Sequence, residues 1–215
     1  ALDNALILDL ERGTDFVDAL KVGVNSLEDL RKVGDAIIAK GKPYKYIVVD
    51  TVTKLEDMVL PLANRLYQST SMGKSWGKLA DGTPDPSANV LNLPNGAGYM
   101  YQREAFFKIT AYIETLADRV IYLGHLKAKF IEKNGKEVLA AEIDLVGKIK
   151  SMLSADVDAI GLLYRDGNKN ILTFKTTDDI ICGSRANHLK NQDIVLSELN
   201  VDNTLTTSWD KVFVD

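Results

Sequence analysis

Three apolar segments of this sequence are each followed by a side chain that can do chemistry, namely Glu11, Asp50 and His125. Each segment has the continuous apolar character of a strand buried on both faces of a parallel sheet. In open α/β sheets, ligands bind at the carboxyl ends of the parallel strands. We therefore expect these three side chains to lie along one edge of a sheet and to form a site there.

Asp50 directly follows the apolar and aromatic run at residues 46–49. An aspartate at such a strand end is what phosphate-transferring folds use to hold Mg²⁺, directly or through water. Carboxylate oxygens are the hard ligands that this ion prefers. The alternative interpretation is a helix N-cap, in which Asp50 or Thr51 satisfies the first turn of the helix that follows.

Glu11 lies just beyond the first strand, where its carboxylate can orient and deprotonate an attacking water. Asp9 competes for this role, because the alternation of an extended segment places both acids on one face. The alternative for Glu11 is a solvated loop carboxylate. The sequence leaves these possibilities open.

His125 is one of two histidines and follows Gly124 at the end of a strand. It can hydrogen-bond a terminal phosphate or the attacking water, and the alternative is a strand-end histidine satisfied by the fold. The second histidine, His188, stands six residues after Cys182. We do not expect a zinc site there, because the pair lacks further ligands.

Gly73-Lys74-Ser75 has the ending of a phosphate-binding loop but not the rest of the motif. The full pattern requires a glycine at position 68, where Gln68 stands, and a strand before it, where we expect a helix. We therefore find no phosphate-cradling glycine loop in these 215 residues. Because a buried-type strand opens the chain without an initiator Met, we expect an N-terminal segment to be missing from this sequence.

Hydrophobic periodicity predicts an α/β fold with a mainly parallel sheet flanked by helices and an antiparallel hairpin extension. We expect a single domain over residues 1–215. The predicted strands lie at 5–8, 22–24, 46–50 and 119–125; helices are expected around 27–38, 55–66, 106–116 and 145–153; hairpins pair 129–131 with 138–140 and 159–164 with 171–174.

Residues 70–98 differ from their surroundings, since they hold 5 of the 15 Gly and 3 of the 5 Pro. Structureless segments of this length in compact domains are usually functional or disordered. We predict a flexible loop.

The composition is that of an ordinary globular chain, with 46% hydrophobic residues and a net charge of −4. The lone Cys182 excludes an internal disulfide framework and fits a reducing compartment. We find neither a run long enough to span a membrane nor a signal segment. We therefore expect a cytoplasmic protein with no membrane partner.

Three motifs carry a family resemblance: Asp-Leu-Glu-Arg-Gly-Thr at 9–14, Tyr-Ile-Val-Val-Asp-Thr-Val-Thr at 46–53 and Ile-Tyr-Leu-Gly-His-Leu-Lys at 121–127. In this order they resemble the phage-encoded RecA-like P-loop ATPases, AAA-type NTP-binding proteins that include single-strand annealing and recombination factors. The resemblance covers roughly residues 5–190.

The resemblance implies ATP and Mg²⁺ as cofactors and gives the polar residues their roles. It makes Asp50 the Walker B aspartate, with Thr51 beside it in the nucleotide site, and Glu11 the catalytic glutamate. His125 takes the place of the polar sensor. Arg185, in Gly183-Ser184-Arg185, is similar to the basic tip that reaches into a neighbouring subunit's site. The sequence departs from the family in lacking the Walker A motif.

Two stretches, residues 65–108 and 119–150, carry more cations than acids. Scattered cations with nearby aromatics can bind single-stranded DNA through phosphate contacts and stacking. The candidate contacts are Lys74, Lys78, Lys127 and Lys129. The alternative is a solvated loop whose aromatic residues belong to the core.

Together these features predict an ATPase of phage DNA recombination, replication or repair, acting on single-stranded DNA as a homo-oligomeric ring or filament. The alternative is a non-catalytic nucleic-acid-binding or assembly protein with a degenerate nucleotide fold. A third possibility is a nucleotide-binding domain unrelated to DNA.

Overall fold

The computed structural model describes residues 2–133, 136–177 and 180–214, except for the side chains of residues 129–139. The chain divides into two compact units. One, here called the parallel-sheet unit, comprises Asp3–His125 and Leu145–Ile149; the other, the antiparallel unit, comprises Ala1–Leu2, Leu126–Asp144 and Lys150–Asp215. The single domain over residues 1–215 stays a prediction, because one domain can contain two compact units.

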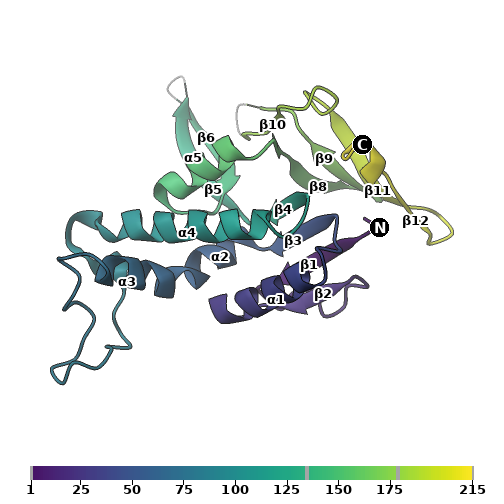
Figure 1. Ribbon diagram of the computed structural model, residues 1–215. Coiled ribbons are helices and arrows are strands. Elements are labelled where there is room, and N and C mark those ends of the chain that lie inside the picture. The colour runs from purple at the N-terminus through teal and green to yellow at the C-terminus, as the bar shows by residue number, and fades with distance from the viewer. Residues whose placement is uncertain (1, 134–135, 178–179, 215) are drawn as a thin grey trace. The chain divides into compact units, whose positions relative to one another are not determined.

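The parallel-sheet unit is built on four strands in the order β2-β1-β3-β4 (Figure 1). All three strand pairings are parallel, as predicted. The strands are β1 (Ala5–Asp9), β2 (Lys21–Gly23), β3 (Tyr46–Asp50) and β4 (Arg119–Leu123).

Four helices belong to this unit, namely α1 (Leu27–Ala39), α2 (Val52–Met58), α3 (Leu60–Gln68) and α4 (Gly98–Glu114). The prediction of a single helix around 55–66 is wrong, because the chain forms two helices with a break at Val59. Pro61 in the first turn of α3 explains the break. Proline has no N–H to continue the preceding helix, but it is well tolerated where a new helix begins.

The crossovers from β2 to β3 and from β3 to β4 run in the same direction across the sheet. Right-handed crossovers then place their helices on the same face. Gly34 of α1 agrees with this arrangement, since a Cβ there would lie 1.9 Å from the Tyr112 hydroxyl of α4. The strand residues of the covered face are nearly inaccessible: Leu6, Leu8, Ile47 and Val49.

Residues 70–98 connect α3 to α4 with turns and two short 3-10 helices, η1 (Val90–Asn92) and η2 (Pro94–Gly96) (Figure 1). Gly98 begins α4 because nothing larger fits; a Cβ would lie 1.9 Å from the Val90 carbonyl oxygen. The irregular structure of this segment matches the expectation from its glycines and prolines. The flexibility of the segment stays a prediction.

A buried carboxylate explains why the segment Leu145–Ile149 belongs to the parallel-sheet unit. Both oxygens of Glu56 in α2 accept from the Val146 backbone N–H, at 2.9 and 3.2 Å. Leu145 and Ile149 on either side are buried. The helix expected at 145–153 is α5 (Gly147–Asp156), which begins within this segment.

The antiparallel unit contains the first predicted hairpin and, in part, the second. Residues 159–160, expected in the second hairpin, pair instead with Gly183–Ser184. β5 (Leu126–Lys133) pairs with β6 (Lys136–Ile143), and the predicted turn at Asn134-Gly135 lies outside the described residues. β8 (Leu162–Asp166) pairs with β9 (Lys169–Thr173) across Gly167, whose positive φ of 58° suits the turn. The remaining elements are β7 (Ala159–Ile160), β10 (Gly183–Ser184), β11 (Asp193–Leu199), β12 (Leu205–Thr207) and η3 (Trp209–Lys211).

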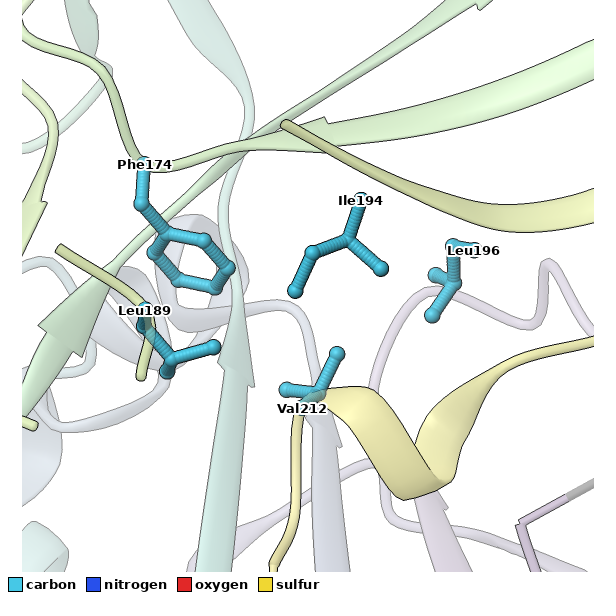
Figure 2. Close-up of a cluster of buried hydrophobic side chains, with 5 residues drawn as sticks. All are labelled: Phe174, Leu189, Ile194, Leu196 and Val212. Atoms are coloured by element: carbon cyan, nitrogen blue, oxygen red, sulfur yellow. The ribbon is translucent and has the colours of Figure 1, made fainter. Parts of the chain in front are cut away.

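The larger sheet of this unit, β12-β11-β9-β8, carries its own core. Figure 2 shows five buried apolar side chains that converge from the sheet and the C-terminal segments: Phe174, Leu189, Ile194, Leu196 and Val212.

Across the part of the chain described, no helix is both long and apolar enough to cross a bilayer.

Candidate active site

The parallel register brings the predicted site residues to one edge of the sheet. Asp9 of β1 and Asp50 of β3 are direct neighbours, and Leu123 of β4 is level with them. The chain therefore carries Glu11 and His125 to the same edge, two residues beyond their strands. The Oε2 atom of Glu11 lies 3.3 Å from Nε2 of His125, an ion pair whenever the imidazole is protonated.

The carboxylate of Asp9 is engaged by the loop that follows it, which distinguishes Asp9 from Glu11. It accepts from the backbone N–H groups of Glu11, Gly13 and Thr14 at 3.1–3.2 Å, and from the Thr14 hydroxyl at 2.5 Å. Burial by itself raises the pKa of Asp9, but these hydrogen bonds, led by Thr14, hold that pKa below its ordinary value. Asp9 therefore shapes the loop that presents Glu11.

Glu11 keeps one side open, since its side chain is 28% exposed. Its Oε1 atom accepts from the Thr51 hydroxyl at 2.6 Å, across 40 residues of sequence. Contacts with Thr51 and His125 thus orient a carboxylate that solvent still reaches, which is the arrangement a general base for water requires.

Asp50 is half-buried, and no hydrogen bond among the described residues reaches its carboxylate. Burial raises its pKa, the negative charges of Asp9 and Glu11 raise it further, and His125 partly offsets them. A carboxylate that lacks donors and sits among other acids is suited to a hard cation.

The described residues contain no group of three or more His, Cys, Asp or Glu side chains placed to hold a metal ion. A Mg²⁺ ion held by Asp50 would therefore take its other ligands from water and substrate oxygens. That is the usual manner of binding for this ion.

Of the two residues considered as helix N-cap, the structure assigns Thr51. Its Oγ1 accepts from the Lys54 N–H at 3.2 Å while its hydroxyl hydrogen goes to Glu11, and the residue is only 3% exposed. The Asp50–Thr51 peptide bond is cis. The Thr51 hydroxyl thus donates one hydrogen bond and accepts another within the protein. Its contact with a nucleotide stays a prediction.

Sequence reasoning missed Thr53. Its Oγ1 accepts from the backbone N–H of His125 at 3.2 Å, across 72 residues, and so ties the end of β4 to the first turn of α2. The spacing Asp50-Thr51-x-Thr53 at a strand-to-helix junction is the local signal that was present in the sequence.

Arg185 lies in the antiparallel unit and caps α5. Its guanidinium donates to the carbonyls of Ala155 and Asp156 at the helix C-terminus, and Nη1 lies 3.5 Å from Asp158 Oδ1. A cation at this end of a helix satisfies carbonyls that have no intrahelical partner. Arg185 and Glu11 belong to different units, and the action of Arg185 on a neighbouring subunit's nucleotide stays a prediction.

The candidate DNA contacts have different surroundings. Lys74 and Lys78 are exposed in the 70–98 loop. Lys127 lies 3.3 Å from Asp144, and the side chain of Lys129 lies outside the described residues. Trp76 packs edge-on against Tyr67 at 5.1 Å between ring centroids, which supports a core role for that aromatic.

The fold and the acidic strand ends define an α/β protein with the architecture of a nucleotide-binding domain. A family model described as AAA domain matches residues 1–186, and the chain belongs to this family. The family is one of AAA-type P-loop NTPases and indicates nucleotide binding and ATPase activity, generally with Mg²⁺. Neither a curated protein nor a solved structure matches the chain.

Proposed function

We propose that this protein binds ATP with Mg²⁺ at the carboxyl edge of β1, β3 and β4 and hydrolyses it. The observation that carries the proposal is the pairing of an oriented, accessible Glu11 with Asp50, an acid that has no hydrogen-bond donor. Mg²⁺ bound at Asp50 would neutralise charge on the phosphates, which is the chemistry this ion supplies in phosphoryl transfer.

The residues of this chain divide the work at the site. Glu11 Oε2 accepts a proton from the attacking water, while the Thr51 hydroxyl keeps the carboxylate in place through Oε1. His125, held at its backbone by Thr53, exchanges its contact with Glu11 for one with a terminal phosphate and so senses the nucleotide. Asp9 takes no part in proton transfer and maintains the loop from which Glu11 projects.

The setting we propose is DNA recombination, replication or repair by a phage-encoded, RecA-like enzyme in the bacterial cytoplasm. Single-stranded DNA is the proposed partner, in contact with Lys74, Lys78, Lys127 and Lys129. The exposed positions of Lys74 and Lys78 support this, as does Tyr99 at the start of α4, which is 47% exposed and available for stacking. We further propose that the protein self-associates and that Arg185 acts on the neighbouring subunit's nucleotide.

The experiment is ATP hydrolysis by the full-length protein, with and without single-stranded DNA, in wild type and Glu11→Gln. Glu104→Gln is the matched control, because Glu104 is an exposed glutamate of α4 that pairs only with Lys108 among the described residues. We expect Glu11→Gln to lower kcat by about 10²–10⁴-fold, the usual contribution of a general base. Nucleotide affinity should be retained, and the control should match wild type.

Each part of the proposal has its own contrary result. Absence of ATP binding by the wild-type protein would overturn the ATPase and leave a non-catalytic DNA-binding or assembly role. Hydrolysis that survives in Glu11→Gln would exclude Glu11 as the base. Hydrolysis that single-stranded DNA does not stimulate, together with no salt-sensitive DNA binding, would overturn only the DNA partner.

A further inference from the structure

The loop between β1 and β2 presents an aromatic side chain entirely to solvent. Phe16 is 104% exposed, and its neighbours Val17 and Leu20 are also exposed, at 47% and 57%. Single apolar residues on a surface are ordinary, but three from one short loop form a patch. Such a patch is typical of a surface that another molecule covers.

This loop is organised by hydrogen bonds of its own. The Lys21 ammonium donates to the backbone carbonyls of Thr14, Asp15 and Val17. At the other side, Asp9 accepts from the N–H and the hydroxyl of Thr14. A loop held in this way loses little conformational freedom on binding, so its apolar residues are available to a partner at low entropic cost.

The charges beside Phe16 indicate the chemistry of that partner. Asp15 and Asp18 flank the exposed apolar residues and are themselves exposed. Two carboxylates repel a phosphate backbone, so the loop is unsuited to DNA. It fits instead an apolar depression with a cation at its rim.

The same chain contains a depression of this kind. A cleft of about 450 Å³ lies between the start of α1 and the junction of α2 with α3. Its apolar lining comes from Leu27, Met58 and Pro61, and its polar lining comes from Asn25, Ser26, Glu28, Arg31, Asp57 and Arg65.

The two arginines of the cleft differ in availability. Arg31 is paired with Glu28 at 2.9 Å and with Asp35 at 3.1 Å. Arg65 is exposed, and within the described ranges it has no ion pair. Arg65 is therefore the cation in the lining that is available to an incoming carboxylate.

We propose that the Phe16 loop of one copy docks into the Arg65 cleft of a second copy. Phe16 enters among Leu27, Met58 and Pro61, and Asp15 or Asp18 pairs with Arg65. In a head-to-tail contact each pair of copies leaves one loop and one cleft free, and repetition of the contact generates a ring or a filament. The inference names the contact for the self-association proposed above and requires no nucleotide hydrolysis.

The test is sedimentation velocity of the full chain over a concentration series, without nucleotide and again with ATP. Phe16→Asp destroys the loop contact, and Met58→Glu destroys the cleft. Val201→Asp is the matched control, because Val201 is as exposed as Phe16, at 105%, but belongs to the antiparallel unit. Circular dichroism verifies that every variant folds.

We expect wild type and Val201→Asp to form dimers and larger species, and each single variant to associate at least about tenfold more weakly, as for a central aromatic contact. A mixture of Phe16→Asp with Met58→Glu contains one intact loop and one intact cleft. It should form a one-to-one dimer and nothing larger.

Two results would overturn the contact. One is association of Phe16→Asp as strong as that of wild type. This result would mean that the protein self-associates through another surface. The other is a wild-type chain that stays monomeric at every concentration, with and without ATP. Binding of a fluorescent ATP analogue, measured on the same samples, reports separately on the proposed ATPase.

Discussion

Two acids stand side by side at the carboxyl edge of the sheet and have opposite surroundings. Asp9 at the end of β1 is 5% exposed and accepts four hydrogen bonds from the loop that follows it. Asp50, its direct neighbour at the end of β3, is only half-buried and has no donor among the described residues. The pKa of Asp9 is lowered and that of Asp50 is raised.

The difference distinguishes Asp9, whose hydrogen bonds stabilise the fold, from Asp50, whose carboxylate is available to a ligand. Hydrogen bonds to a carboxylate stabilise its charged form, so Asp9 contributes to folding. A partly buried carboxylate among other acids costs stability when ionised, and a protein retains such a group at functional sites. Four substitutions or conditions test this distinction, from the largest expected effect to the smallest.

Asp9→Ala should destabilise the protein by about 3 kcal/mol, because it removes the acceptor of the buried Thr14 N–H and hydroxyl and of the part-buried N–H groups of Glu11 and Gly13. Urea unfolding measures the change. Asp15→Ala, an exposed acid of the same loop, is the control and should cost less than about 0.5 kcal/mol. A loss below about 1 kcal/mol for Asp9→Ala would mean that water replaces its hydrogen bonds.

Asp50→Asn should impair ATP hydrolysis and leave stability unchanged, in contrast to the loss of stability expected for Asp9→Ala. We expect ATP hydrolysis at saturating Mg²⁺ to fall by about 10²-fold, or about 2.7 kcal/mol in the barrier, with no loss of stability. Steady-state kinetics and thermal unfolding on the same preparation give both quantities. A variant that unfolds more readily but hydrolyses ATP normally would make Asp50 a structural residue.

Thr14→Val isolates one of the bonds to Asp9. The hydroxyl donates to a buried carboxylate at 2.5 Å, so its removal should cost about 1.5 kcal/mol. Thr83→Val is the matched control, since Thr83 donates to Asp81 at 2.6 Å on an exposed loop. This substitution should lower the free energy of unfolding by less than about 0.5 kcal/mol. Equal losses in the two variants would contradict the importance of burial.

The pH dependence of stability should show the two acids acting in opposite directions. Asp9, with its lowered pKa, contributes stability above its ordinary pKa, and this is lost as the pH falls through the folded-state value. Asp50, with its raised pKa, contributes stability that is lost as the pH rises through its folded-state value.

The comparison of wild type with Asp50→Asn isolates the second effect. The stability of Asp50→Asn relative to wild type should increase from acidic to neutral pH, by well under about 1 kcal/mol because solvent screens a half-exposed group. Urea unfolding at pH 4 and pH 7 measures it. A relative stability that decreases over this range would mean that Asp50 gains a partner when ionised.

The parallel character of the sheet and the polar residues that follow β1, β3 and β4 were predicted from the sequence, whereas the order of the strands across the sheet was not. Strand character depends on continuous apolar runs, and a parallel sheet brings the carboxyl ends of its strands to one edge whatever the details of packing. The positions of Glu11, Asp50 and His125 follow from this rule. The hairpins followed from equally local turn signals.

The roles within that edge were decided by tertiary structure. Asp9 and Glu11 are equivalent by alternation, and only the return of Thr14 onto Asp9 separates them. Likewise, the contacts of Glu11 with Thr51 and of His125 with Thr53 span 40 and 72 residues. A hydrogen bond needs its partners within about 3 Å, and spacing along the chain does not determine such a distance between elements that meet only in the folded protein.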